Sequence, residues 1–305
     1  MNTLKISLFG NFTCAFVNNA NIDIEPRKAQ ELLCYLLLHR NQRHEREKLA
    51  ALLWSEKNTS QSKKYLRQTL WQLQSILNIA PKQPDLLDIE HHQIGVNQDA
   101  DLWLDVLFFD QAALVVGKTP GNQLNAQQAQ LLMNTLPLYT GDLLDGWYQE
   151  WCIYERERYQ MLYLTFLDKL TEYHGSRGKY ELALNYGNAI LKYDRARERT
   201  HRQLMRLLYL AGHRTQAIHQ YETCVAALSE ELGVPPAQST VDLYAQICAD
   251  HLTPQSFVPT EPIHRQAGFP APKQLDARRE LEQIQATLVV LQNRVTQLIN
   301  QLELR

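Results

Sequence analysis

Residues 60–78 read SQSKKYLRQTLWQLQSILN, and this stretch decides the fold of the first hundred residues. Its leucines recur at helical spacing and form one narrow stripe that must face a core. The stripe consists of Leu66, Leu70, Leu73 and Leu77. Thr59 or Ser60 is the expected N-cap of this helix. The opposite side is polar and carries Gln61, Lys64, Gln68, Trp71, Gln72 and Ser75, with Arg67 at its flank.

The segments before and after this helix predict strands, two further helices and a hairpin. Residues 3–25 alternate like short strands (LKISLFG, FTCAFV, NIDI), and Pro26 opens a helix with the sequence RKAQELLCYLLLHR. A second helix is expected over residues 45–54. After residue 84, LLDIE and QIGVN flank His91 and His92 and predict a hairpin. Strands, three helices and a closing hairpin predict a winged helix-turn-helix over residues 1–97.

From Asp99 to about Ala249 the pattern is continuously helical, which predicts a second domain over residues 98–249. Residues 178–183 (GKYELA) are echoed 34 residues later by residues 212–217 (GHRTQA). This is the period of tetratricopeptide repeats, in which small residues let paired helices pack closely. The predicted fold class is therefore mainly α, with small sheets only in the winged helix.

Two segments follow the helical region. Residues 250–274 contain five prolines among polar residues and predict an extended linker. Residues 275–305 carry apolar residues at alternating spacings of three and four, which is typical of a coiled-coil seam. The seam consists of Leu281, Ile284, Leu288, Leu291, Val295, Leu298 and Leu302. We expect this helix to mediate self-association; the alternative is an amphipathic helix that folds back on its own chain.

Composition and charge limit the classes of function that the protein can have. The net charge is −2, but residues 1–97 hold 12 Lys and Arg against 9 Asp and Glu. Residues 40–67 hold eight basic residues and three acidic ones, which indicates a phosphate-facing surface. No apolar stretch is long enough for a membrane helix. The five cysteines are scattered without a CxxC pair, so we expect small core residues of a reduced, cytoplasmic protein.

The polar face of the third helix has the chemistry of a helix that reads the major groove. Gln68 and Gln72 can pair with adenine edges, and Lys64 or Arg67 with guanine or phosphate. Trp71 is expected to contact a thymine methyl or the sugar-phosphate wall, or else to pack against the hairpin. The alternative for the whole face, Ser75 included, is an ordinary solvated surface.

Supporting contacts are expected outside this helix. Arg43, Arg46, Lys48 and Lys63 would position the domain on phosphates without specifying sequence. At the hairpin tip His92, beside His91, is assigned either to the minor groove or to a plain turn. No Cys or His residues nearby complete a metal site, so neither a metal nor a cofactor is expected.

The sequence also resembles a known family. Residues 4–97, with PRKAQELLCYLLLHR, HEREKLAALLW and SKKYLRQTLWQLQSIL, resemble the winged helix of antibiotic regulatory protein (SARP) activators. Residues 99–249 resemble the bacterial transcriptional activator domain that follows it there, most specifically in LAGHRTQAIHQY and EELGVPP. The resemblance implies a winged helix joined to tetratricopeptide-like helices, which binds promoter repeats in double-stranded DNA and recruits RNA polymerase. The family often has an Arg-rich run where this chain has Gln72, Gln74 and Ser75.

These observations predict a sequence-specific DNA-binding regulator that acts as an oligomer. An enzyme is not expected, because the chain lacks GxxxxGK[ST], HExxH, GxSxG and GxGxxG. The alternative is an adaptor protein that has kept the fold without DNA binding and uses its helical repeats and coiled coil to bind proteins. A steep salt dependence of DNA binding distinguishes the two, because only phosphate neutralisation releases counterions.

Overall fold

The computed structural model describes residues 3–16, 21–77 and 85–252, all within one compact unit that spans residues 1–254. The linker predicted over residues 250–274 lies outside the described residues beyond Leu252, and so does the whole of the predicted coiled-coil segment. Among the described residues, no helix is long and apolar enough to cross a membrane.

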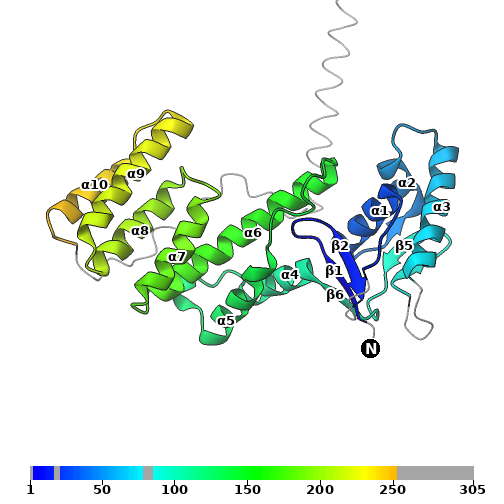
Figure 1. The fold of residues 1–305 in the computed structure, drawn as a ribbon, viewed down its shortest axis with the longest axis horizontal. Helices are drawn as coiled ribbons and strands as arrows, with labels where there is room; N and C mark the ends of the chain where they lie inside the picture. Colours follow the sequence, from blue (N-terminus) through cyan, green and yellow to red (C-terminus); the bar gives the residue numbers. More distant parts are fainter. Residues whose placement is uncertain (1–2, 17–20, 78–84, 253–305) are drawn as a thin grey trace, which may run out of the picture. The chain divides into compact units, whose positions relative to one another are not determined.

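The winged helix is present and has the predicted order of elements (Figure 1). Its elements are β1 (Leu4–Ser7), β2 (Thr13–Phe16), α1 (Arg27–Leu38), β3 (His44–Glu45), α2 (Arg46–Leu53), α3 (Thr59–Leu77), β4 (Leu87–Ile89) and β5 (Gln93–Val96). Strands β4 and β5 pair antiparallel and β3 adds to β5, so the closing hairpin becomes a small three-stranded sheet. The apolar faces of the three helices fill the space between the two sheets with leucines.

The leucine stripe of α3 is buried as predicted. Leu66, Leu70 and Leu73 are at most 3% exposed, and Leu77 is 9% exposed. The prediction of Thr59 or Ser60 as the N-cap of α3 was wrong. Asn58 caps the helix, and its Oδ1 accepts a hydrogen bond of 2.9 Å from the backbone N–H of Gln61. Asn is as good an N-cap as Ser or Thr, and propensity alone does not separate adjacent candidates.

The first sheet includes a strand in the region that was predicted to be helical. β6 (Leu102–Leu104) pairs parallel with β1, which lies between β2 and β6. The prediction of continuous helix from Asp99 was therefore wrong at its beginning, and the predicted boundary at residue 97 falls between β5 and β6. The expected strand NIDI is also wrong, since Asn21 forms only an isolated bridge to Ala15. The carbonyl of Ile24 instead accepts a hydrogen bond from the side chain of Gln30 on α1.

The remainder of the described chain is helical. Its elements are α4 (Asp105–Val116), the 3-10 turn η1 (Gly121–Gln123), α5 (Ala126–Thr135), the 3-10 turn η2 (Leu136–Leu138), α6 (Glu150–Gly175), α7 (Tyr180–Leu191), α8 (Glu198–Leu210), α9 (Arg214–Leu232) and α10 (Gln238–Cys248). Helices α6 and α7 form one antiparallel pair and α8 and α9 the next, as the 34-residue period predicts (Figure 1).

The two copies of the repeated motif occupy equivalent positions. Gly178 and Gly212 each follow the first helix of a pair and have φ of 71° and 82°, a conformation that favours glycine. Ala183 and Ala217 are both fully buried inside the second helix of each pair. The tetratricopeptide-like repeat is therefore confirmed.

The winged helix and the first helices behind it share one hydrophobic core. Phe9, just after β1, packs its ring against Phe109, Tyr139 and Tyr159, with centroid distances of 4.7, 4.9 and 5.4 Å. Backbone hydrogen bonds between residues 142–145 and residues 8–10, with donors on both segments, hold the same corner together. A second, smaller core lies among α8, α9 and α10.

Cysteine burial follows the prediction with one exception. Cys14, Cys34, Cys152 and Cys224 are buried and unpaired, and burial raises the pKa of each thiol. Cys248 is exposed, which corrects the prediction that all five are core residues. It is the last residue of α10, where the helix leaves the core.

Candidate nucleic-acid interface

Helix α3 presents a polar face opposite its buried leucines. Of the residues predicted to read DNA on this helix, Lys64, Arg67, Gln68, Trp71 and Ser75 are exposed, and so is Gln61. Lys63 and Gln72 are half-buried at the two margins of the face. One exposed surface on one helix therefore carries most of the predicted contact residues.

Among the described residues of the winged helix, Trp71 is the most exposed large hydrophobic residue. Its side chain is 69% exposed, which excludes the alternative that it packs against the hairpin. One turn later, the Ser75 hydroxyl donates to the Trp71 carbonyl over 2.8 Å, so its proton is already used. Ser75 can still accept a hydrogen bond, but it is not free to donate one.

The predicted phosphate-binding cations divide into two groups. Arg43 pairs with Asp88 and Glu90 of the hairpin, and Arg46 donates to the Glu90 carbonyl over 3.2 Å. Two lysines pair with glutamates: Lys48 of α2 with Glu45, the N-cap of that helix, and Lys63 of α3 with Glu47 of α2. In contrast, Lys64 and Arg67 form no ion pair with any residue that the structure describes.

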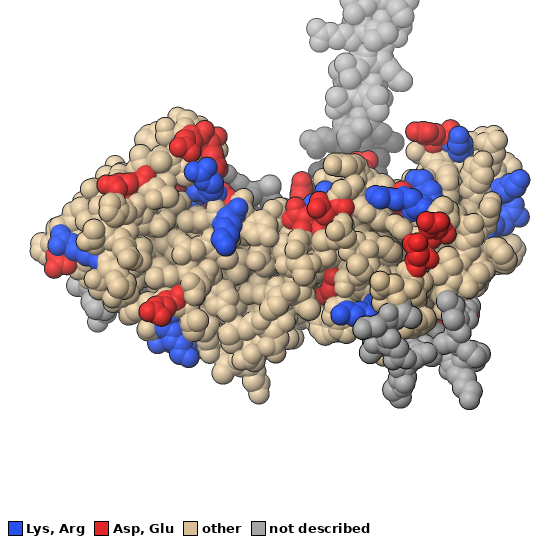
Figure 2. Space-filling model, in the orientation of Figure 1, with Lys and Arg blue, Asp and Glu red and all other residues tan. Residues whose placement is uncertain are grey.

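These carboxylate partners were not predicted from the sequence. Only Glu45 and Lys48, three residues apart at the start of α2, were visible as a pair by spacing. The partners of Arg43 and Lys63 come from other elements and depend on how the hairpin and α2 pack. Figure 2 shows the result on one face of the molecule, where basic and acidic side chains are interleaved and no wide patch of one sign forms.

A hollow of about 460 Å³ lies between α2, α3 and the hairpin tip. Its lining consists of Arg46, Glu47, Lys63, Leu66, Arg67, His91 and His92. The two histidine rings stack with centroids 4.4 Å apart and planes 4° apart, and both are exposed at the tip of the β4–β5 hairpin. Within the described residues, no group of three or more His, Cys, Asp or Glu side chains is placed to hold a metal ion.

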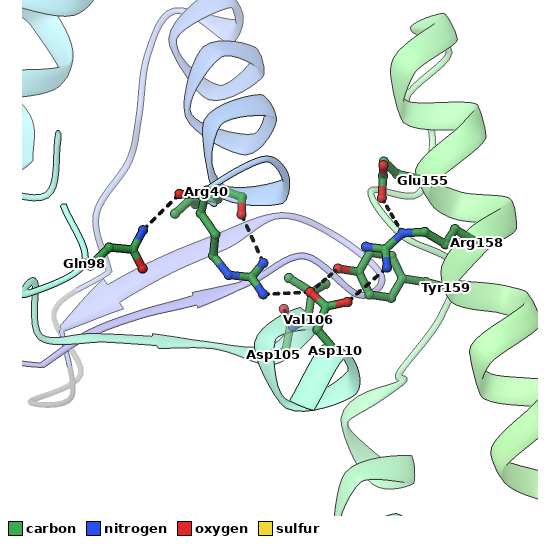
Figure 3. Close-up of polar contacts among 9 residues, drawn as sticks. Arg40, Gln98, Asp105, Val106, Asp110, Glu155, Arg158 and Tyr159 are labelled. Atoms are coloured by element: carbon green, nitrogen blue, oxygen red, sulfur yellow. Dashed lines mark hydrogen bonds and ion pairs between the residues drawn. The ribbon is translucent and has the colours of Figure 1, made fainter. Parts of the chain in front are cut away.

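An ion-pair cluster holds the winged helix on the helices behind it (Figure 3). Arg40, two residues after α1, pairs with Asp110 of α4 over 2.7 Å. The same carboxylate accepts from Arg158 over 3.0 Å and from the Tyr159 hydroxyl over 3.2 Å, both on α6. The Gln98 amide donates to the Arg40 carbonyl over 2.9 Å. Since α1 also packs against α3, this cluster fixes the exposed face of α3 relative to α4 and α6.

Comparison with known proteins assigns the helical part. Residues 104–248 match the family model described as the bacterial transcriptional activator domain. The match covers slightly under half of the chain and supports the resemblance to SARP-like transcriptional regulators over these residues.

The structure around this domain also has a solved counterpart. It is similar to that of Mycobacterium tuberculosis EmbR, which was solved in complex with a low-affinity phosphopeptide, with a TM-score of 0.68 and 16% sequence identity. The match covers 83% of this chain and 67% of the EmbR chain, and at this identity it concerns the fold. No curated protein matches the sequence. The bacterial transcriptional activator domain thus follows a winged helix here, in a fold that EmbR shares.

Proposed function

We propose that this chain is a sequence-specific DNA-binding transcriptional regulator, an activator that binds promoter repeats as an oligomer and contacts RNA polymerase. The observation that carries the proposal is the exposed face of α3, where the side chains of Lys64, Arg67, Gln68 and Trp71 form no hydrogen bond or ion pair with any described residue. A cationic and amide-rich helix face beside a hairpin is the arrangement by which winged helices enter the major groove. A bacterial transcriptional activator domain behind it supports the same function.

Each side chain has a role by its chemistry. Gln68 and Gln72 would pair with adenine edges, and Arg67 with a guanine edge or a phosphate. Trp71 would lie on a thymine methyl or along the sugar-phosphate wall. At the hairpin tip, His92 would enter the adjacent minor groove. The backbone would be held by Arg43, Arg46, Lys63 and Lys64.

Oligomerisation would supply the affinity that a single domain lacks. One winged helix covers a short half-site, and joining two through residues 275–305 raises the effective concentration of the second at the DNA. The proline-rich residues 250–274 would set which spacings of the half-sites are reachable. Recruitment of RNA polymerase is assigned to the bacterial transcriptional activator domain.

The test is a selection of bound fragments from genomic DNA of the source organism, followed by a salt titration of the best fragment. We expect a repeated short motif, binding that falls steeply with salt, and loss of the preference for the motif in Arg67→Ala and Gln68→Ala. Lys118→Ala and Gln127→Ala, which remove exposed side chains outside the winged helix, are the matched controls and should bind like the parent. Absence of any enriched fragment with a folded protein would refute the proposal.

The second candidate function is an adaptor that binds proteins and not DNA. It is favoured by the ion pairs that engage Arg43, Lys48 and Lys63, because these cations are then not available to phosphates without rearrangement. Under this function, the binding of any duplex would be weak and would not depend on Arg67. The same salt titration separates the two functions.

A further inference from the structure

Lys63 of α3 is held by a carboxylate of the preceding helix. Its ammonium bonds Glu47, which lies 16 residues earlier in the first turn of α2. By this hydrogen bond and by its charge, Lys63 keeps the pKa of Glu47 below its usual value, so the carboxylate is ionised at neutral pH. The side chains of Glu47 and Lys63 are 72% and 43% exposed, so the pair lies at the surface, where such contacts are weak and exchange with other ions.

The surroundings of this pair are cationic. Both residues line the hollow between α2, α3 and the hairpin tip, together with Arg46 and Arg67. Glu47 is the one carboxylate among the residues that line it. Arg67 has no ion pair with any described residue, and Arg46 bonds only a backbone carbonyl. An anionic group in this hollow therefore faces three cations, and in the free protein that group is Glu47.

The other ion pairs of the winged helix differ in position. Glu45, the N-cap of α2, pairs with Lys48 of the same helix, and neither residue lines the hollow. Arg43 pairs with Asp88 and Glu90 along the hairpin and is likewise outside the lining. Among the ion pairs of the described residues, only the Glu47–Lys63 pair joins α2 to α3, whose Lys64 and Arg67 are exposed.

We propose that Glu47 takes the place of a DNA phosphate on Lys63 in the free protein, and that it thereby limits DNA affinity. The inference rests on the proposed DNA binding. A phosphate that approaches Lys63 must displace the Glu47 carboxylate or remain beside it as a like charge. Neutralising Glu47 would free Lys63 for one more phosphate contact and remove that repulsion.

The test uses the full chain and a 30-base-pair duplex of arbitrary sequence, since phosphate contacts do not depend on base sequence. Glu47→Gln keeps the size of the side chain and removes its charge. One added phosphate contact steepens the slope of log K against log salt by about 0.9, which is roughly eight-fold tighter binding at 0.1 M salt. The matched control is Glu230→Gln on α9, which removes the same charge from an exposed ion pair with Arg195 outside the winged helix and should leave the slope unchanged.

A double variant decides whether Lys63 carries the effect. In a Lys63→Gln background, Glu47→Gln should leave the slope unchanged, because no cation is left to release and only the repulsion is relieved. Equal slopes for the parent and Glu47→Gln, or a slope that still steepens without Lys63, would overturn the inference while leaving DNA binding intact. Absence of duplex binding by the parent and by every variant, with normal circular dichroism, would instead refute the proposed function.

Discussion

The contact that holds the winged helix on the activator domain makes a quantitative prediction. Replacing Asp110 with Ala removes the carboxylate that accepts from Arg40, Arg158 and Tyr159 (Figure 3). Arg40 is 8% exposed, and its guanidinium then keeps only a hydrogen bond of 3.3 Å to the Leu37 carbonyl. The variant thus leaves a buried cation without a counter-charge.

The magnitude follows from burial. Removing one partner of a fully buried pair costs about 3–5 kcal/mol, because the remaining charge is desolvated and uncompensated. The side chains of Asp110 and Arg158 are 21% and 43% exposed, so solvent screens part of the loss. We therefore expect Asp110→Ala to lower the free energy of unfolding by about 2–3 kcal/mol.

Urea-induced unfolding of the full chain at pH 7 measures this loss. The matched control is Glu230→Ala, which breaks the exposed contact with Arg195 and should cost less than about 0.5 kcal/mol. A double variant with Arg40→Met and Asp110→Leu removes both charges together and should recover most of the stability, because no unpaired charge remains. The reasoning is refuted if Asp110→Ala costs no more than Glu230→Ala, or if the double variant is as unstable as the single one.

Three further predictions concern other parts of the chain. Burial raises the pKa of Asp105 from 3.8 to about 6 although three backbone N–H groups donate to its carboxylate, so the folded state favours the protonated form. This contribution to the free energy of unfolding, about 3 kcal/mol, is complete below pH 3.8 and is lost as the pH rises through 6. Asp105→Asn should therefore flatten the pH dependence of urea-induced unfolding by the same amount. Parallel curves of unfolding free energy against pH for the parent and the variant would contradict this. A Cβ at Gly121 would lie 2.4 Å from the Lys169 carbonyl, so Gly121→Ala should lower the free energy of unfolding by about 1–3 kcal/mol. Gly187→Ala should cost less, because the nearest atom to a Cβ there is a leucine methyl that can move. Thermal melting of the two variants compares the losses. Deleting residues 275–305 should abolish cooperative binding to paired half-sites in a gel-shift titration while leaving the melting temperature of the remaining chain unchanged, and unchanged cooperativity would exclude oligomerisation through this segment.

Much of the fold was predictable from periodicity. The leucine stripe of α3, the hairpin around His91 and His92, and the repeat that places Gly178 and Gly212 in equivalent turns were all predicted from spacing alone. These features are local: the geometry of a helix turn or a tight turn fixes which neighbours share a face, so the pattern survives in the sequence. The exposed face of α3 followed from the same argument.

Two features depended on contacts between distant segments. The parallel pairing of β6 with β1 joins residues almost a hundred positions apart. Strand β6 has only three residues and directly precedes α4, so it was not recognised in the sequence. The cluster around Asp110 brings together α4, α6 and the end of α1, none of which carries a local signal of the others. Both features arise from tertiary contacts between segments that are far apart in the sequence. Such contacts leave no periodic pattern along the chain from which they could be predicted.

The same division applies to the candidate site. Helix geometry assigns the cations and amides to one face of α3, so spacing along the chain was enough to identify them. Which of those cations are already paired depends on how α2 and the hairpin pack against α3. Lys63 is paired because the first turn of α2 packs beside α3, and Arg43 because the hairpin returns beside it. Ion pairs form between whatever charges packing brings within a few ångströms, so the electrostatics of this surface is a property of the packed domain and not of any single helix.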